Sequence, residues 1–199
     1  MPRIPAVPDA EAGVLGRLAY RFARHRFGQV PEPFAVWRHH PGLFWTAAAT
    51  ESVVERVAVR VPAGLRDLAT HRVAARVACS WCVDFGAMLA SREGVDVQRL
   101  RRAGADGAPD DPEFDETERL VLAYADAATT TPISVSDELV EALDRRLGRD
   151  GVVELTHLIA LENMRARFNG ALGITDQGYC AVPAPSVPAP SAAAGDVPT

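Results

Sequence analysis

The chain has 199 residues, 48% of them hydrophobic, and a formal net charge of −5, which describes an ordinary globular protein with enough residues for one sizeable core. The mild acidity argues against a nucleic-acid binder, and the absence of lysine among the 21 basic residues excludes a Schiff-base mechanism. No apolar run is long enough for a membrane span, and residues 1–13 lack the apolar segment of a secretory signal, so we expect a cytoplasmic protein.

The predicted elements are helices in almost every part of the chain, and no run of alternating β-branched residues indicates a strand. Near the N-terminus, apolar residues at helical spacing predict helices over 10–28, 34–39 and 43–50, with a turn at Pro41-Gly42. Residues 52–59 fit either a helix or a strand, because their valines suit both.

The next stretch, residues 65–78, has the apolar stripe of a strongly amphipathic helix. Helices are also predicted over 81–91 and 95–103, and the Gly-, Asp- and Pro-rich residues 105–112 are typical of a surface loop. Three arginines of the amphipathic helix fall outside its apolar stripe: Arg66, Arg72 and Arg76.

The second half of the chain contains clear helix start and stop signals. Asp115 and Glu118 form a capping box that starts one helix, and Ser136 is the N-cap of another. Gly148 closes that second helix, and the long apolar-rich helix over 152–172 ends at a further glycine.

Residues 181–199 are dominated by Pro, Ala and Ser, so we predict a disordered tail after a single domain over residues 1–180. The wide apolar stripe of the last helix exceeds what one small bundle needs, which favours a homo-oligomer. Glu154 and His157, three residues apart, could suggest a metal pair, but without a second such motif a helix-surface or interface role is favoured. The polar residues near that stripe are Glu154, His157, Glu162, Asn163 and Asn169.

The most informative motif is Cys79-Ser80-Trp81-Cys82, at the seam between two predicted helices. Two thiols three residues apart close a disulfide with little backbone movement, and a helix N-terminus favours thiolate over thiol. We therefore expect an accessible, readily ionised redox pair. One thiolate attacks a peroxide or a disulfide, and the other resolves the product into an internal disulfide.

Two other interpretations of this pair stay open. A structural zinc site needs four ligands, and no second paired motif accompanies Cys180, His71 or His157. Two buried cysteines that only pack are the other interpretation, because free Cys behaves as a small hydrophobe. Packing alone, however, does not explain placement at a helix start.

A reactive thiol needs a group that takes its proton, and Asp67 and His71 are the candidates. They are four residues apart on one predicted helix and therefore share a face. If that face lines the pocket of the dithiol, a carboxylate–imidazole relay passes protons to a sulfur; the alternative is a plain surface pair. Asp84 is expected in the first turns of the next helix, facing its N-terminal dipole.

Several segments occur in a recognisable order: Leu65-Arg66-Asp67-Leu68, Arg72-Val73-Ala74, Cys79 to Gly86, and Asn163 to Gly173. This ordered set resembles the carboxymuconolactone decarboxylase-like family, which includes alkylhydroperoxidase D, over residues 35–175. The resemblance implies an all-α helical bundle of the alkylhydroperoxidase D-like type with about seven to nine helices. It also implies a homo-oligomer, because the family forms dimers, trimers and hexamers.

By this resemblance, Cys82 is the attacking cysteine, Cys79 is the resolving cysteine, and Asp67 stands where the family has its relay glutamate. The family's peroxidase motif has a histidine four residues after the second cysteine, where this chain has Gly86. The nearest proton acceptor of the attacking thiol is therefore missing, and His71 is the candidate substitute.

These features predict a thiol-dependent peroxidase or disulfide oxidoreductase that acts on a small hydroperoxide or another small molecule. No metal or organic cofactor is expected, and the expected reductant is a lipoyl or thioredoxin-like protein. Two alternatives come from other classes. One is a non-catalytic binding or assembly module with a relic CxxC motif; the other is a decarboxylase acting on a small carboxylic acid or lactone.

Overall fold

A computed structural model describes residues 2–180, and within them the protein is all-α, as predicted. The predicted number of helices is confirmed, and no strand occurs in the described residues. The helices are α1 (Gly13–Phe27), α2 (Glu32–Trp37), α3 (Pro41–Val57), α4 (Ala63–Arg76), α5 (Ser80–Arg92), α6 (Val97–Gly104), α7 (Glu116–Thr129) and α8 (Asp137–Leu172), with a 3-10 turn, η1 (Ala108–Asp110), before α7. The predicted tail over 181–199 lies outside the described residues.

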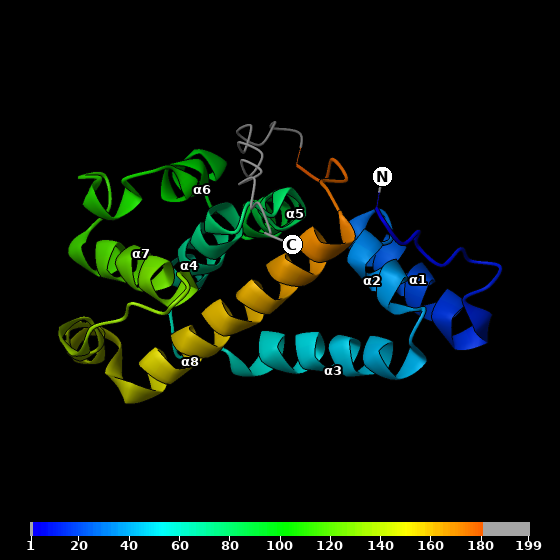
Figure 1. Cartoon of the computed structure of the whole chain (residues 1–199), viewed down its shortest axis with the longest axis horizontal. Coiled ribbons are helices and arrows are strands. Elements are labelled where there is room, and N and C mark those ends of the chain that lie inside the picture. The colour runs from blue at the N-terminus through cyan, green and yellow to red at the C-terminus, as the bar shows by residue number, and fades with distance from the viewer. Residues whose placement is uncertain (1, 181–199) are drawn as a thin grey trace, which may run out of the picture.

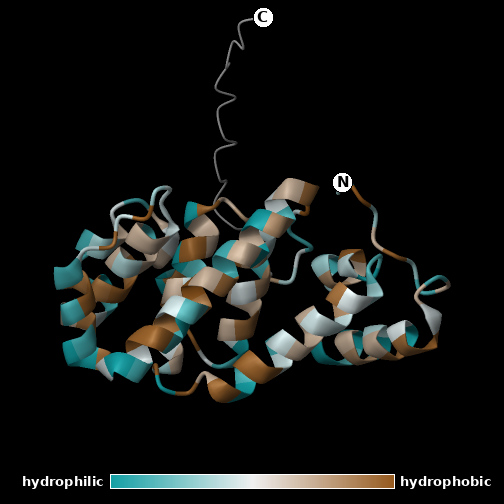
Figure 2. Ribbon diagram, turned by 60° about the horizontal axis from the view of Figure 1, so that its bottom comes forward, coloured by the Kyte–Doolittle hydropathy of each residue, from teal (hydrophilic) through white to brown (hydrophobic). Residues whose placement is uncertain are grey.

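The helices form two groups on either side of α8, which runs obliquely across the molecule (Figure 1). Helices α4 to α7 lie on one side of α8 and α1 and α2 on the other, while α3 leads from the second group to the first. We call α1 to α3 the arm and α4 to α8 the body. Apolar and polar residues alternate along the helices, as expected where each helix buries one face (Figure 2).

The core of the body is built around α4, which contacts α5, α6, α7 and α8. Val73 on α4, Val121 on α7 and Leu155 on α8 are fully buried in this core. Each such side chain contributes about 1.5–3 kcal/mol when it leaves water, so the body holds α4 and the residues that follow it in place. The arm has a smaller core of its own around Tyr20 and Phe44.

Arg72 is buried in the body, although its position in the sequence placed it outside the apolar stripe of its helix. Its guanidinium donates to both carboxylate oxygens of Asp126, at 2.6 and 2.7 Å, and to the carbonyl oxygens of Ala103 and Ala105. A buried cation is tolerated only when its donors are satisfied in this way. Arg72 therefore joins α4 to α7 and to the end of α6.

The predicted start and stop signals account for most of the observed helix ends. The capping box of Asp115 and Glu118 is present, and Ser136 caps α8. Gly148 adopts φ 72° inside α8, which confirms the predicted break, although the helix resumes at once. The predicted turn at Pro41-Gly42 is wrong: both residues lie in the first turn of α3, where proline is tolerated because its missing N–H has no partner there.

The structure also revises two other expectations, one in α3 and one in the loop over 105–112. Helix α3 runs without interruption through residues 43–50 and into residues 52–57, so the ambiguous valine-containing segment is helical. The loop over 105–112 contains η1, and Ala108 within it is buried rather than at the surface. The limits of the single domain stay a prediction.

Candidate active site

The turn between α4 and α5 sets the position of both cysteines. Ala78 adopts φ 59°, a left-handed conformation that costs a non-glycine residue about 1–2 kcal/mol. The backbone N–H of Cys79 donates to the carbonyl oxygen of Ala74 at 2.9 Å, which fixes the reversal after α4. Cys79 then takes an extended conformation as the N-cap of α5.

Cys79 and Cys82 form a disulfide, with their Cα atoms 5.3 Å apart. The Sγ atom of Cys79 also accepts a hydrogen bond from the backbone N–H of Cys82 at 3.2 Å. Both sulfurs thus lie at the first turn of α5, as the sequence predicts, where unpaired N–H groups and the helix dipole stabilise negative charge.

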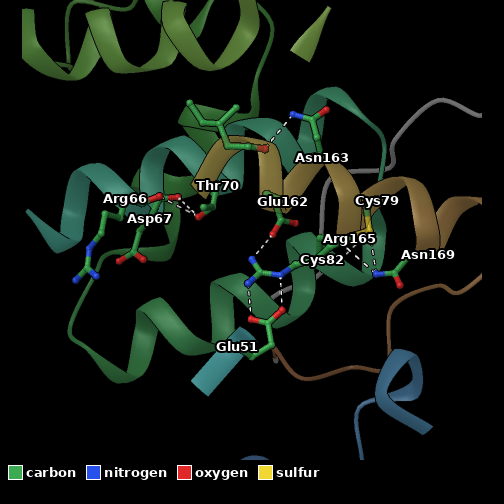
Figure 3. Close-up of polar contacts among 11 residues, drawn as sticks. Glu51, Arg66, Asp67, Thr70, Cys79, Cys82, Glu162, Asn163, Arg165 and Asn169 are labelled. Carbon is green, nitrogen blue, oxygen red and sulfur yellow. Dashed lines mark hydrogen bonds and ion pairs between the residues drawn. A yellow bond between two sulfur atoms is a disulfide. The ribbon is translucent and has the colours of Figure 1, made fainter. Parts of the chain in front are cut away.

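Asn169 on α8 contacts both sulfurs. Its side-chain Nδ2 donates to Cys79 Sγ at 3.6 Å and to Cys82 Sγ at 3.5 Å, and the residue is 1% exposed (Figure 3). A donor aimed at both sulfurs stabilises a thiolate on either one. Sequence reasoning named Asn169 only as a polar residue beside the apolar stripe, because its spacing on α8 gives no sign of a partner on α5.

Cys82 borders a cavity of about 690 Å³ between the arm and the body. Cys79 and Cys82 are 3% and 7% exposed, so the expected accessibility is corrected: neither lies open on the surface, and Cys82 lines the cavity. Aromatic side chains form much of the wall, including Phe22, Phe34, Trp37, Trp45, Trp81 and Phe85. An oxidant therefore reaches Cys82 through an apolar chamber.

Asp67 and His71 line the same cavity from α4, as expected if their shared face borders the dithiol. They are not hydrogen-bonded to each other: Oδ2 of Asp67 and Nδ1 of His71 are buried without a partner in the described structure. Burial raises the pKa of Asp67 to about 6 and lowers the pKa of His71 to about 4. His71 is therefore a neutral imidazole at neutral pH.

A partly buried ion network connects α3 and α8 (Figure 3). Arg165 donates from Nε to Glu51 Oε1 at 2.9 Å and from Nη1 to Glu162 Oε2 at 3.0 Å, and its Nη2 also pairs with Glu51. All three residues line the cavity. Burial raises the pKa of Glu162 to about 7, against the opposing effect of Arg165. Sequence reasoning missed this network, because Glu51 and Arg165 are 114 residues apart.

Gly86 lines the cavity one helical turn after Cys82. A Cβ atom at this position would meet no other atom within 4 Å. A Cβ atom is therefore accommodated at the position where the family has its histidine.

Asp84 was expected to face the N-terminal dipole of its helix. Instead, its side chain is buried against the last residues that the structure describes. Its carboxylate accepts the backbone N–H groups of Gln177, Tyr179 and Cys180 at 2.7–3.2 Å. The side-chain oxygen of Gln177 accepts from the Trp81 indole at 2.8 Å and from the backbone N–H of Glu32 at 2.7 Å. This segment thus joins α5 to the arm beside the cysteines.

The described residues show neither a cluster of metal-binding side chains nor a helix suited to a membrane. Within residues 2–180, no three His, Cys, Asp or Glu side chains come together as a group that could hold a metal ion. Among the described helices, none combines the length and apolar character that crossing a membrane requires.

Comparisons with known proteins gave two relatives by sequence, and no family model matches the chain. The protein is 36% identical to the uncharacterized protein YnjA of Escherichia coli over 161 residues, covering 80% of this chain and 87% of YnjA. It is 33% identical to alkyl hydroperoxide reductase Rv2159c of Mycobacterium tuberculosis over 109 residues, but these cover only 31% of that longer protein.

Solved structures share the fold. An alkylhydroperoxidase AhpD core protein from Ralstonia eutropha superposes with a TM-score of 0.78 and 16% identity, covering 89% of this chain and 94% of that one. The debrominase Bmp8 superposes with a TM-score of 0.75 and 19% identity, covering 88% and 92%. A further structure of Bmp8 holds 2,3,4-tribromopyrrole.

Proposed function

Because the chain belongs to the alkylhydroperoxidase D-like family, we propose that it is a thiol-dependent oxidoreductase that reduces organic hydroperoxides through Cys79 and Cys82. One observation carries this proposal. The two sulfurs lie at a helix N-terminus, close enough to be bonded, with Asn169 donating to both and Cys82 on the cavity wall. These are the features that lower a thiol pKa and bring an oxidant to the sulfur.

The cycle balances without a cofactor. Cys82 thiolate attacks the outer oxygen of the hydroperoxide, the O–O bond breaks, and the alkoxide leaves with a proton as an alcohol, so Cys82 becomes a sulfenic acid. The Cys79 thiol then displaces water and forms the disulfide. An external dithiol, of the lipoyl or thioredoxin-like kind, reduces the disulfide by exchange.

The aromatic lining of the cavity supports a bulky apolar substrate rather than hydrogen peroxide. Its aromatic wall between α1, α2, α3 and α5 offers apolar contact to an alkyl or aryl group and little to a small polar molecule. We therefore expect cumene hydroperoxide to react faster than hydrogen peroxide.

Stopped-flow oxidation of the reduced protein is the direct test. In a Cys180→Ser background, only the paired thiols remain, and intact mass should show a loss of two hydrogens after one equivalent of cumene hydroperoxide. Cys82→Ser should abolish the reaction, whereas Cys79→Ser should stop at the sulfenic acid. A rate no faster than that of free cysteine would refute peroxidase activity and favour a binding module with a relic motif. Turnover of a small carboxylic acid that persists in Cys82→Ser would favour the lyase.

Reductive dehalogenation of an aromatic compound is a second candidate, because the cavity is aromatic-walled and the position of the peroxidase histidine is Gly86. In this reaction, Cys82 thiolate takes a halogen from carbon, the carbon gains a proton, and Cys79 displaces halide as the disulfide forms. Release of bromide from 2,3,4-tribromopyrrole by the reduced protein, without oxidation by cumene hydroperoxide, would favour this candidate over the first.

We also propose that the protein assembles with copies of itself through the arm. Large apolar side chains are exposed on α1 and α3, among them Leu15, Leu18, Phe22, Val53 and Val57. Leu15, Leu18 and Phe22 also line the cavity, and large apolar side chains exposed together on one part of a protein are typical of an interface. Light scattering should give a multiple of the 21.3 kDa chain mass, and Leu18→Glu should reduce it.

A further inference from the structure

Resting on the proposed peroxidase function, we infer that Glu162 is the general acid that protonates the leaving oxygen of the hydroperoxide. Glu162 also accepts the thiol proton that the family's histidine, at the position of Gly86, takes from the attacking cysteine. Glu162 lies on α8, whereas the motif residues expected to move protons lie on α4 and α5.

Glu162 lines the same cavity as Cys82 and Asn169. Asn169, which contacts both sulfurs, follows Glu162 by seven residues, about two turns or about 10 Å along the axis of α8, so both side chains lie on one face of the helix. A hydroperoxide bound in this cavity reacts when its outer oxygen is about 3 Å from Cys82 Sγ and its inner oxygen is about 2.7 Å from the Glu162 carboxyl.

The hydrogen bonds of Glu162 leave one oxygen for a ligand. Within the described residues, Oε2 accepts from Arg165, and Oε1 has no hydrogen-bond partner. Arg165 is itself fixed by Glu51 on α3, so the carboxyl of Glu162 is held in position from the arm as well as from its own helix. One cation shared by two carboxylates leaves the trio with an excess negative charge unless one carboxyl keeps its proton. The more buried carboxyl is Glu162, whose side chain is 9% exposed against 41% for Glu51.

The other titratable residues of the cavity are less suited to this step. His71 is neutral at neutral pH and carries no proton that it gives up readily, because burial lowers its pKa to about 4. Asp67 has one methylene fewer than the family's glutamate, so its carboxyl reaches less far from α4. Glu93 and Arg66 act on the charge of Asp67 rather than on that of Glu162.

The proton balance closes over one turnover. Cys82 gives its thiol proton to the Glu162 carboxylate, directly or through water. The thiolate attacks the peroxide, the O–O bond breaks, and the alkoxide takes the proton from Glu162, which returns to the carboxylate. Cys79 then supplies the proton for the water that leaves when the disulfide forms.

Comparison of two oxidants with different leaving groups tests the inference. Cumene hydroperoxide expels an alkoxide, which needs an acid, and perbenzoic acid expels a carboxylate, which does not. In the Cys180→Ser background, Glu162→Gln should slow oxidation by cumene hydroperoxide about 100-fold and oxidation by perbenzoic acid less than about threefold. Glu141→Gln is the matched control, since Glu141 is exposed on the same helix; both its rates should equal those of the parent protein.

Two results would overturn the inference alone. An equal loss with both oxidants would show that Glu162 only maintains the structure, and no loss with either would show that it plays no part. A parent protein that reacts with neither oxidant faster than free cysteine would overturn the proposed function as well, so the two failures are distinguishable.

Discussion

Replacing Asn169 by leucine should raise the pKa of the Cys82 thiol. Asn169 Nδ2 lies 3.5 Å from Cys82 Sγ and 3.6 Å from Cys79 Sγ, and leucine keeps similar bulk but donates nothing. A hydrogen bond to a charged group is worth about 1.5–3 kcal/mol, and one pKa unit corresponds to about 1.4 kcal/mol. Because both contacts are long and one amide serves two sulfurs, we take the lower end, a rise of about one pKa unit.

The rate of alkylation by iodoacetamide, measured against pH, gives this value. In a reduced protein that also carries Cys79→Ser and Cys180→Ser, Cys82 is the one remaining thiol. Asn169→Leu should then lower the alkylation rate near pH 7 about tenfold, with the curve shifted to higher pH and its plateau unchanged.

Asn163→Leu is the matched control, because Asn163 lies on the same helix but donates to Thr129 and to the carbonyl oxygen of Ile159. Its alkylation profile should coincide with that of the parent. If the Asn169→Leu profile also coincides with that of the parent, the amide does not stabilise the thiolate and the reasoning fails.

The remaining predictions concern stability and proton supply. Arg72→Met should lower the free energy of unfolding in urea by about 3–5 kcal/mol because it leaves Asp126 without its buried partner, whereas Arg76→Met, on the surface, should cost at most about 1 kcal/mol. The pKa of Asp67 is raised to about 6 in the folded protein, so the free energy of unfolding of the wild type should fall as the pH rises from 3.8 to about 6. Asp67→Asn should be more stable than the wild type above this range and equally stable below it. Denaturation midpoints that differ by the same amount at every pH would contradict this. Gly86→His adds an imidazole one helical turn after Cys82, at a position where a Cβ atom has free space, and should speed oxidation by cumene hydroperoxide about 10- to 100-fold in the Glu162→Gln protein. An unchanged rate in stopped flow would show that the added ring cannot supply the proton.

Local signals in the sequence predicted local structure well. The capping box at Asp115, the break at Gly148 and the cysteines at a helix start each depend on residues within a few positions, and the structure confirms all three. The family resemblance supplied the fold, which periodicity alone leaves as an unspecified helical bundle.

The parts of the site that could not be predicted depend on partners far away in the chain. Asn169 and Cys82 are 87 positions apart and Arg72 and Asp126 are 54 positions apart, and contacts at such separations leave no periodic pattern in the sequence. Glu162 has the same difficulty, because a glutamate beside an apolar stripe is usually a solvated residue. Its burial follows from Arg165, whose other partner belongs to the arm.

The amide of Gln177 has a consequence for how long a functional chain must be. Its oxygen accepts hydrogen bonds from the Trp81 indole and from the backbone N–H of Glu32 in α2, while its Nε2 donates to the carbonyl oxygen of Val30 at 3.2 Å. A protein cut before this residue would retain all eight helices and the disulfide. It would nevertheless lose the hydrogen bonds that join Trp81 on α5 to residues 30–32 of the arm, so the segment around Gln177, and not the helices alone, holds the arm against the body beside the cavity.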